Sequence, residues 1–375
     1  METALYSALH FLVDGVCAFA MFGRFLPRGD AAFSLLFYNF CAFALQLPLG
    51  LLLDLYLEKR GEASELPLLA AAAGAAVTVL GAFTSPVVLG IGNTLFHVGG
   101  GVGTILTDHR KGLKGRALGC FVAPGALGLF FGTGLGKAGE LLYGGAAAAA
   151  GGAMLLLLAG LAFLHRREKG DPESAEALRT LPAGPERKEK KAPGDPGPVF
   201  RRELLITGCA FCVVILRSLC GFWVQFPWKT AYAASLLAVL MTALGKAGGG
   251  FLAARFGAGR TAACTLTAAA VCYLLGGTAV FGLSALFLFN MTMPVTLYLL
   301  ADRYRRRPGS FFGLLTFGLF LGFLPVLLTG NAGASSAAGA LPGPFSGGSV
   351  TGAGIAVLSL LLLLPALSAA ERSPL

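Results

Sequence analysis

The sequence predicts an all-α membrane protein with twelve transmembrane helices in two six-helix bundles. The first observation is composition. The mean hydropathy is +0.74 and only 13% of the residues are charged, whereas a soluble domain carries about 25% charged residues. The second is glycine: the 54 glycines among 375 residues follow no collagen-like period, and glycine at this density suits helices that pack closely in lipid.

Twelve apolar segments can each cross the hydrocarbon core as a helix, since a span needs roughly 20 residues. Their approximate boundaries are 4–25, 31–56, 66–84, 86–107, 116–137, 141–164, 202–224, 230–255, 260–281, 283–301, 310–329 and 348–368. The chain starts without a basic region or cleavage site, so we expect the first segment to be a retained helix and not a signal peptide.

The distribution of lysine and arginine predicts the orientation. With the N-terminus in the cytoplasm, the cytoplasmic segments hold 23 of the 29 cations, and only Arg217 and Lys246 lie inside spans. This bias satisfies the positive-inside rule. We therefore expect a multi-pass protein of the cell inner membrane with both termini in the cytoplasm. Basic loops that set the topology and contact the lipid bilayer account for the net charge of +10. We therefore expect no nucleic-acid partner.

One polar segment divides the chain. Residues 165–201 are rich in proline and in charges of both signs, a composition typical of a disordered linker, with a short helix expected near 173–180. This predicts an N-terminal six-helix bundle over 1–164, a cytoplasmic linker over 165–201 and a C-terminal six-helix bundle over 202–375. We expect the protein to be a monomer.

Two internal repeats relate the halves. The stretch 50-GLLLDLYLEKRG-61 matches 250-GFLAARFGAGRT-261, which lies 200 residues later. Asp108, Gly115 and Gly119 match Asp302, Gly309 and Gly313, which lie 194 residues later. Internal repeats that build a central site are typical of secondary transporters.

The repeated stretches carry a family resemblance. The segment 250-GFLAARFGAGR-260 resembles the cytoplasmic loop motif of the major facilitator superfamily, in which a glycine precedes an acidic position and then basic residues. Asp54 occupies the acidic position in the first copy, and Ala254 occupies it in the second. The resemblance implies that helices one, four, seven and ten surround a central cavity.

A narrower resemblance involves three helices. The segments 10-HFLVDG-15, 46-QLPLGLLLD-54 and 91-IGNTLFHVGG-100 are similar to the first, second and fourth helices of fosmidomycin-resistance-type efflux transporters. The chain departs from that pattern at Val98, where the family has proline. It also has 132-GTGLG-136 in place of the family's Gly-Pro motif in helix five.

Three ionisable residues inside spans are candidates for proton coupling, because such residues are expensive in a membrane and mark function by default. His10 and Asp14 are four residues apart and share one helix face, so the pair could take up and release a proton. His97 lies about halfway along the fourth span and could bind a proton or the substrate. The alternatives are that His10 and Asp14 clip helix one to a neighbour, and that His97 bonds a backbone carbonyl for packing.

Arg217, His97, Asn39, Asn93 and Asn290 are the candidate substrate-binding residues. Arg217 lies 15 residues into the seventh span, and a guanidinium binds carboxylate or phosphonate groups through a planar fork. The alternative for Arg217 is that Asp14 or a carbonyl already satisfies it. The alternative for each asparagine is contact between helices.

A cytoplasmic gate is expected from Asp54, Arg110, Arg116 and Lys246. Asp54 should lie near the start of helix five or the 108–116 loop, where Arg110 or Arg116 can reach it and close the outward-facing state. Lys246 lies nearer the cytoplasmic side of helix eight, where it could instead extend to the membrane surface.

These residues favour a secondary active transporter, most simply one that exports an anionic or amphiphilic small molecule against protons. An importer of a small metabolite is the alternative within the same fold. Imidazole titrates near neutral pH, which favours protons over sodium. The chain has no Walker A loop for direct ATP drive.

Two other classes of function have less support in the sequence. A membrane enzyme would need a catalytic constellation beyond a histidine base, and no H-E-x-x-H or G-x-S-x-G occurs in the spans. The C-x-x-C of Cys209 and Cys212 has no companion ligands nearby, so we expect neither a metal nor a cofactor. A receptor that does not transport a solute is a further alternative.

Overall fold

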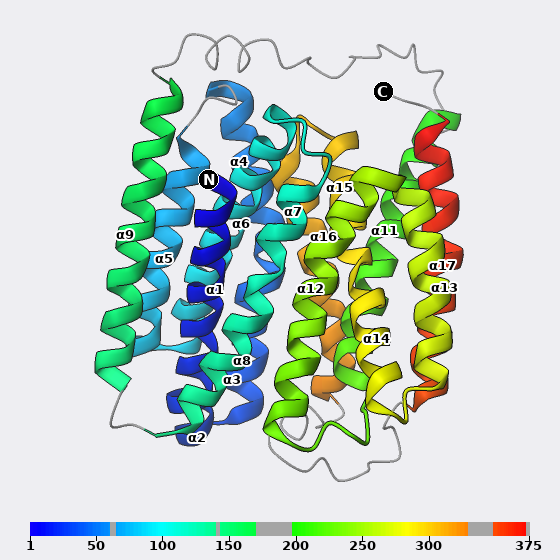
Figure 1. The fold of residues 1–375 in the computed structure, drawn as a ribbon. Helices are drawn as coiled ribbons and strands as arrows, with labels where there is room; N and C mark the ends of the chain where they lie inside the picture. The colour runs from blue at the N-terminus through cyan, green and yellow to red at the C-terminus, as the bar shows by residue number, and fades with distance from the viewer. Residues whose placement is uncertain (61–64, 140–142, 170–196, 329–347, 373–375) are drawn as a thin grey trace.

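The computed structural model describes residues 1–60, 65–139, 143–169, 197–328 and 348–372, and these residues are nearly all helical (Figure 1). The helix expected near 173–180, and most of the expected linker, lie outside the described residues. Each of the twelve expected spans corresponds to one helix or to consecutive helical pieces.

The helices of the N-terminal half are α1 (Glu2–Ala20), η1 (Met21–Phe25), α2 (Leu26–Arg28), α3 (Ala31–Asn39), η2 (Phe40–Ala44), α4 (Gln46–Arg60), α5 (Leu66–Thr84), α6 (Pro86–Arg110), α7 (Arg116–Val122), α8 (Pro124–Lys137) and α9 (Tyr143–Lys169). Those of the C-terminal half are α11 (Pro198–Trp223), α12 (Tyr232–Phe256), α13 (Ala258–Leu274), α14 (Ala279–Asn290), α15 (Thr292–Arg303), α16 (Pro308–Leu328) and α17 (Ser349–Glu371).

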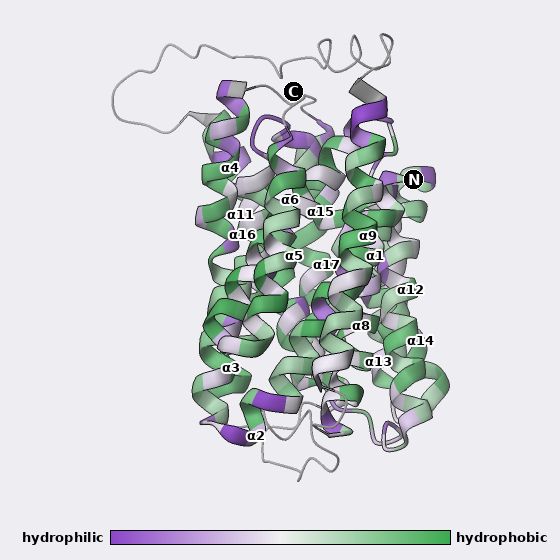
Figure 2. Ribbon diagram, turned by 90° about the vertical axis from the view of Figure 1, so that its left-hand side faces the viewer, coloured by the Kyte–Doolittle hydropathy of each residue, from purple (hydrophilic) through white to green (hydrophobic). Residues whose placement is uncertain are grey.

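The described helices are those of a multi-pass membrane protein. Ten helical segments among them are long and apolar enough to cross a membrane. The two remaining spans are α6, whose Asn93, His97 and glycines lower its hydropathy, and α13, which has 17 residues. Hydrophobic residues cover the middle of the helices, and hydrophilic residues gather at both ends (Figure 2).

The helices form two bundles that stand side by side (Figure 1). In the first, α1 packs against α8, α6 and α9, and α5 packs along α6. In the second, α11 packs against α16 and α17, while α13 packs against α14 and α17. The predicted class, an all-α membrane protein with two six-helix bundles, is confirmed.

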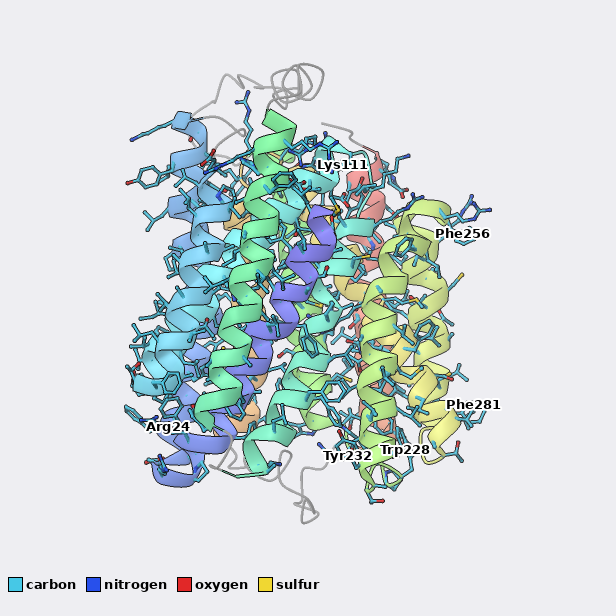
Figure 3. All side chains as sticks on the ribbon, turned by 60° about the vertical axis from the view of Figure 1, so that its left-hand side comes forward. Arg24, Lys111, Trp228, Tyr232, Phe256 and Phe281 are labelled. Carbon is cyan, nitrogen blue, oxygen red and sulfur yellow. The ribbon has the colours of Figure 1, made fainter. Side chains whose placement is uncertain are left out.

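The two ends of the molecule differ in what they carry. We call the end that holds Lys169 and Pro198, together with the start of α1 and the end of α17, the linker end. Lys111 and Phe256 lie toward this end, whereas Arg24, Trp228, Tyr232 and Phe281 lie toward the opposite end (Figure 3). Which end faces the cytoplasm stays a prediction from the positive-inside rule.

Glycines allow α1 and α8 to touch along their length. Gly125, Gly128, Gly132 and Gly136 recur every three or four residues and therefore occupy one face of the helix. A Cβ atom on Gly128 would lie 2.1 Å from the carbonyl oxygen of Phe11, and one on Gly132 would lie 2.1 Å from that of Gly15. Close backbone contact through small residues is the usual way in which membrane helices associate.

The most extensive contacts between the bundles join two pairs of helices toward the linker end, α4 with α16 and α7 with α12. A Cβ atom on Gly50 would lie 2.1 Å from the oxygen of Gly309, and one on Gly313 would lie 2.3 Å from that of Gln46. In the second pair, a Cβ atom on Gly250 would lie 2.6 Å from the oxygen of Gly115.

Candidate functional site

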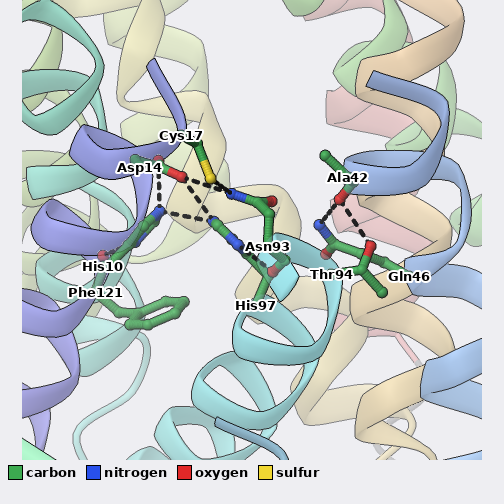
Figure 4. A network of polar contacts seen from close by, with 9 residues as sticks. All are labelled: His10, Asp14, Cys17, Ala42, Gln46, Asn93, Thr94, His97 and Phe121. Carbon is green, nitrogen blue, oxygen red and sulfur yellow. Dashed lines mark hydrogen bonds and ion pairs between the residues drawn. The ribbon is translucent and has the colours of Figure 1, made fainter. Parts of the chain in front are cut away.

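A buried cluster of three ionisable side chains lies in the N-terminal bundle (Figure 4). The Nε2 atom of His10 lies 3.1 Å from the carboxylate of Asp14, and that of His97 lies 3.6 Å from it. The two Nε2 atoms lie 3.0 Å apart. The structure therefore brings α1 and α6 together around the three residues that the sequence nominated for proton coupling.

The second nitrogen of each imidazole fixes its tautomer. His10 Nδ1 lies 2.6 Å from the carbonyl oxygen of Phe121, and His97 Nδ1 lies 2.9 Å from that of Asn93. A carbonyl oxygen only accepts hydrogen bonds, so both Nδ1 atoms must carry the hydrogen. In the neutral rings, both Nε2 atoms are then bare acceptors.

Three acceptors consequently point at one another. The lone pairs of His10 and His97 and the carboxylate of Asp14 converge, and an added proton on either Nε2 would be held by the other imidazole and by the carboxylate. Asn93 Nδ2 supplies a hydrogen bond of 3.1 Å to the carboxylate, and it lies 3.5 Å from the Cys17 sulfur. The cluster is suited to hold one proton.

A proline in helix five explains how the chain reaches His10. Pro124 has no backbone N–H, so α7 ends at Val122 and α8 begins at Pro124. The break frees two carbonyls for side chains of α1: Ser7 donates to Cys120 at 3.0 Å, and His10 donates to Phe121. Gly125 follows, and a Cβ atom there would lie 2.4 Å from His10 Nε2 and 2.5 Å from the Asp14 carboxylate.

A π-helical turn supports the other side of the cluster. In η2 the backbone pairing is shifted, which leaves the carbonyls of Cys41 and Ala42 open to side chains. Thr94 of α6 donates to both, at 2.5 and 3.0 Å. Gln46 also donates to Ala42, at 2.5 Å, and Figure 4 shows both bonds to Ala42. The bonds of Thr94 hold α6 in place at the residue next to Asn93.

The two cations of the expected spans belong to the C-terminal bundle. Arg217 lies in α11 and Lys246 in α12, both inside the molecule with partly accessible side chains. The Nε atom of Arg217 is buried and has no hydrogen-bond partner among the described residues. Lys246 lies within electrostatic reach of both Arg217 and Asp14.

Two of the nominated asparagines contact their own helices. Asn39 donates to Leu35 and Asn290 donates to Leu286, each at 2.8 Å. Asn93 is the asparagine that reaches the ionisable cluster.

The expected gate contacts of Asp54 are wrong in this conformation. Asp54 accepts from the backbone amides of Gly309 and Ser310, at 2.8 and 2.7 Å, and from the Ser310 hydroxyl at 2.6 Å. It thus caps α16 of the opposite bundle and not the 108–116 loop. The first amides of a helix lack partners within the helix and carry partial positive charge, which is why they attract the carboxylate.

The arginines of the expected gate have other surroundings. Arg110 pairs with the buried Glu2 at 2.5 Å, and Thr107 also donates to Glu2. Arg116 is exposed beside Asp108, whose carboxylate accepts from the amides of Gly115 and Ala117.

The ionisable cluster also has the donor atoms of a metal site, since one atom from each of His10, Asp14 and His97 lies within 4.8 Å of the others. The same three atoms are acceptors for a proton, so the geometry fits either ligand.

The fold of the chain has counterparts among solved structures. The chain is similar over its whole length to the fucose:proton symporter FucP of E. coli with the substitution N162A, with a TM-score of 0.52, 14% identity and 98% of that chain covered. It is also similar to the major facilitator superfamily transporter FucP in the outward conformation, with a TM-score of 0.57, 15% identity and both chains fully covered. No family model matches the chain, and the comparison with curated proteins found no match.

The likeness establishes the fold of the chain as that of the major facilitator superfamily transporters. At 14–15% identity it extends to the arrangement of helices and not to a substrate.

Sequence reasoning missed two features of the site. The glycine face of α8 was visible as the spacing of residues 125, 128, 132 and 136, which repeats at the period of a helix. The partner of Arg110 was not visible, because Glu2 lies 108 residues away along the chain.

Proposed function

We propose that this chain is a proton-coupled secondary active transporter of the major facilitator superfamily, which moves a small organic solute by alternating access. The convergence of His10, His97 and Asp14 on one proton position carries the proposal. A proton held by three buried acceptors is a group that a transporter can load on one side of the membrane and release on the other.

We further propose that the solute is anionic or amphiphilic. Lys246 lies within electrostatic reach of Asp14 and of Arg217, and Arg217 Nε has no hydrogen-bond partner among the described residues. A buried cation without a partner is stabilised by a bound anion. Asn93 and His97, which contact Asp14 and His10 in the cluster, are the next candidates for contact with the solute. Export was favoured by the sequence, with import as the alternative.

The contact between α4 and α16 is the proposed latch of the linker end. Asp54 joins the two bundles there, so the described conformation is closed at that end. If the linker end is cytoplasmic, as the positive-inside rule predicts, opening it would release the solute and proton to the cytoplasm. The monomeric state, the inner-membrane location and the domain boundaries at 164 and 202 stay predictions.

The test is proton movement in proteoliposomes that contain the purified full chain and a trapped pH-sensitive dye. We expect at least one of a panel of anionic, neutral and cationic solutes to move protons across the membrane, in either direction. Asp14→Asn should abolish that signal, because it removes the charge that retains the proton. Asp30→Asn, which alters the cap of α3, is the matched control and should keep it.

Proton movement that persists undiminished in Asp14→Asn would contradict the proposal. So would wild-type vesicles in which no solute of the panel moves protons.

A further inference from the structure

The distances within the ionisable cluster match those between the ligands of one metal ion. The Nε2 atoms of His10 and His97 lie 3.0 Å apart, and the Asp14 carboxylate lies 3.1 and 3.6 Å from them. A tetrahedral zinc ion with bonds of about 2.0–2.1 Å holds its ligand atoms about 3.3 Å apart. All three side chains are more than nine-tenths buried. One ion of this size reaches all three after small shifts.

The hydrogen bonds around the cluster are those that orient metal ligands. A histidine that binds a metal almost always donates its other N–H to a carbonyl or carboxylate, and a metal-binding carboxylate accepts hydrogen bonds of its own. The two imidazoles donate to the carbonyls of Phe121 and Asn93, and the Asn93 side chain donates to the Asp14 carboxylate. All three ligand groups are thus held in orientation before any ion binds.

Two further features leave a place for a metal ion and a fourth ligand. Asn93 Oδ1 is buried and has no hydrogen-bond partner among the described residues, and a water molecule bound to the ion would donate to such an oxygen. A Cβ atom on Gly125 of α8 would lie 2.4 Å from His10 Nε2 and 2.5 Å from the Asp14 carboxylate. The glycine therefore keeps the space beside these two ligand atoms free of a side chain.

The ligand set selects the class of ion. Imidazole suits zinc, iron, nickel and copper, and two imidazoles with one carboxylate make three ligands of a four-coordinate zinc site. Calcium takes about six to eight oxygen ligands, and magnesium an octahedron of oxygens. A cluster with one carboxylate and two nitrogens disfavours both of these ions.

We propose that His10, Asp14 and His97 form a three-ligand site for one divalent transition-metal ion of the zinc class. The ion binds the atoms that otherwise hold the coupling proton, so it excludes the proton and blocks coupled transport. The site itself goes beyond the proposed function, whereas the block rests on it. The expectation of no metal was drawn from Cys209 and Cys212, which lie in the other bundle.

The first test is zinc binding to the purified full chain, measured by calorimetry. We expect one tight site per chain for zinc and no binding of magnesium at the same concentrations. Asp14→Asn and His97→Gln should each weaken zinc binding about 100-fold or more, since loss of a group that only supports a ligand already costs about 10–100-fold. His109→Gln, which removes an imidazole of α6 outside the cluster, is the matched control and should bind zinc like the wild type.

Zinc binding that survives in both cluster variants would place the ion elsewhere and overturn the proposal. A wild-type chain that does not bind zinc would also overturn it.

The second test identifies the ligands without any substitution. X-ray absorption at the zinc edge of the wild-type complex should show nitrogen and oxygen ligands at about 2.0–2.2 Å, with the scattering typical of imidazole rings. Zinc held by cysteines of the chain would instead show sulfur at about 2.3 Å, and that result would overturn the site.

The third test separates the metal site from the proposed function. Where a solute moves protons in proteoliposomes, zinc on both sides of the membrane should stop that movement at concentrations that saturate the site, and magnesium should not. Undiminished proton movement with a saturated site would overturn the block and leave the site intact. If no solute moves protons, the proposed function and the block fail together, whereas calorimetry and X-ray absorption still decide the metal site.

Discussion

At the residue scale, the decisive feature is the orientation of two imidazole rings. Because both Nδ1 atoms donate to carbonyls, of Phe121 and Asn93, both Nε2 atoms must accept. Neither histidine alone would define a proton position. It is their 3.0 Å approach, with Asp14 beside them, that does so.

Replacing His97 by glutamine should weaken proton binding. The variant replaces an imidazole nitrogen, which can itself take up the proton, by an amide oxygen, which can only accept a hydrogen bond from it. A hydrogen bond to a charged group contributes about 1.5–3 kcal/mol. We expect the pH at which transport is half-maximal to move down by about one unit or more, since about 1.4 kcal/mol corresponds to tenfold in affinity. Initial rates in proteoliposomes across a pH series measure this. An unchanged pH profile would show that His97 has a packing role only.

Gly125→Ala should disable the site, because the added Cβ atom would lie 2.4 Å from His10 Nε2. A shift of α8 away from α1 would separate His10 from the Phe121 carbonyl, and overpacking of this kind costs about 1–3 kcal/mol. We expect solute-driven proton movement to fall at least about tenfold and thermal stability to drop. Gly134→Ala in the same helix is the control, since nothing lies within 4 Å of its Cβ position. Equal behaviour of the two variants would refute the packing argument.

At the element scale, interruptions of helices place the site. The break between α7 and α8 at Pro124 releases carbonyls toward α1, and the π turn η2 releases carbonyls toward α6. Both devices expose backbone oxygen atoms inside the bundle, where side chains satisfy them. The helix ends act in the same way at the linker end, where α16 presents its first amides to Asp54.

Asp54→Ala should open the linker end. The variant loses all three hydrogen bonds that join α4 to α16, each of which is strengthened by the charge of the carboxylate. Spin labels at positions 58 and 307, whose native side chains lie 3.9 Å apart, report the separation in a protein whose eight cysteines are replaced. We expect the distance distribution to shift to longer values. Asp302→Ala, whose carboxylate pairs with Arg305 of its own segment, should not shift it, and an unshifted Asp54→Ala protein would refute the latch.

At the scale of the whole molecule, the sequence repeat reappears in the contacts between the bundles. Gly50 touches Gly309, and Gly250 touches Gly115. The partners in these two contacts are related by the same spacings, 200 and 194 residues, that relate the repeats in the sequence. The interface is therefore built twice from one pattern. Asp54 exists only in the first copy, because the second has Ala254 in its place, so one side alone has a carboxylate latch.

The orientation of the molecule is open to a direct test. Single cysteines at position 111, toward the linker end, and at position 232, toward the opposite end, can be placed in the same cysteine-free background. In intact cells, we expect an impermeant maleimide to label position 232 and to label position 111 only after the cells are broken, as the positive-inside rule requires. The reverse pattern would invert the topology.

The sequence by itself determined the twelve spans, the two bundles and the list of ionisable residues inside them. Apolar runs and the spacing of residues along a helix are local properties, and burial of charge in a membrane is costly enough to make His10, Asp14, His97, Arg217 and Lys246 stand out. The pairing of His10 with Asp14 was readable for the same reason, because the two lie on one turn of one helix.

Only the tertiary structure decided what these residues meet. The approach of His97 to His10 joins positions 87 residues apart, and the contact of Asp54 with Ser310 joins positions 256 residues apart. Such partners depend on the rotation and depth of packed helices, which close glycine contacts set to within fractions of a helical turn. A local pattern does not encode that rotation, and this is why Asp54 was expected at the 108–116 loop but caps α16.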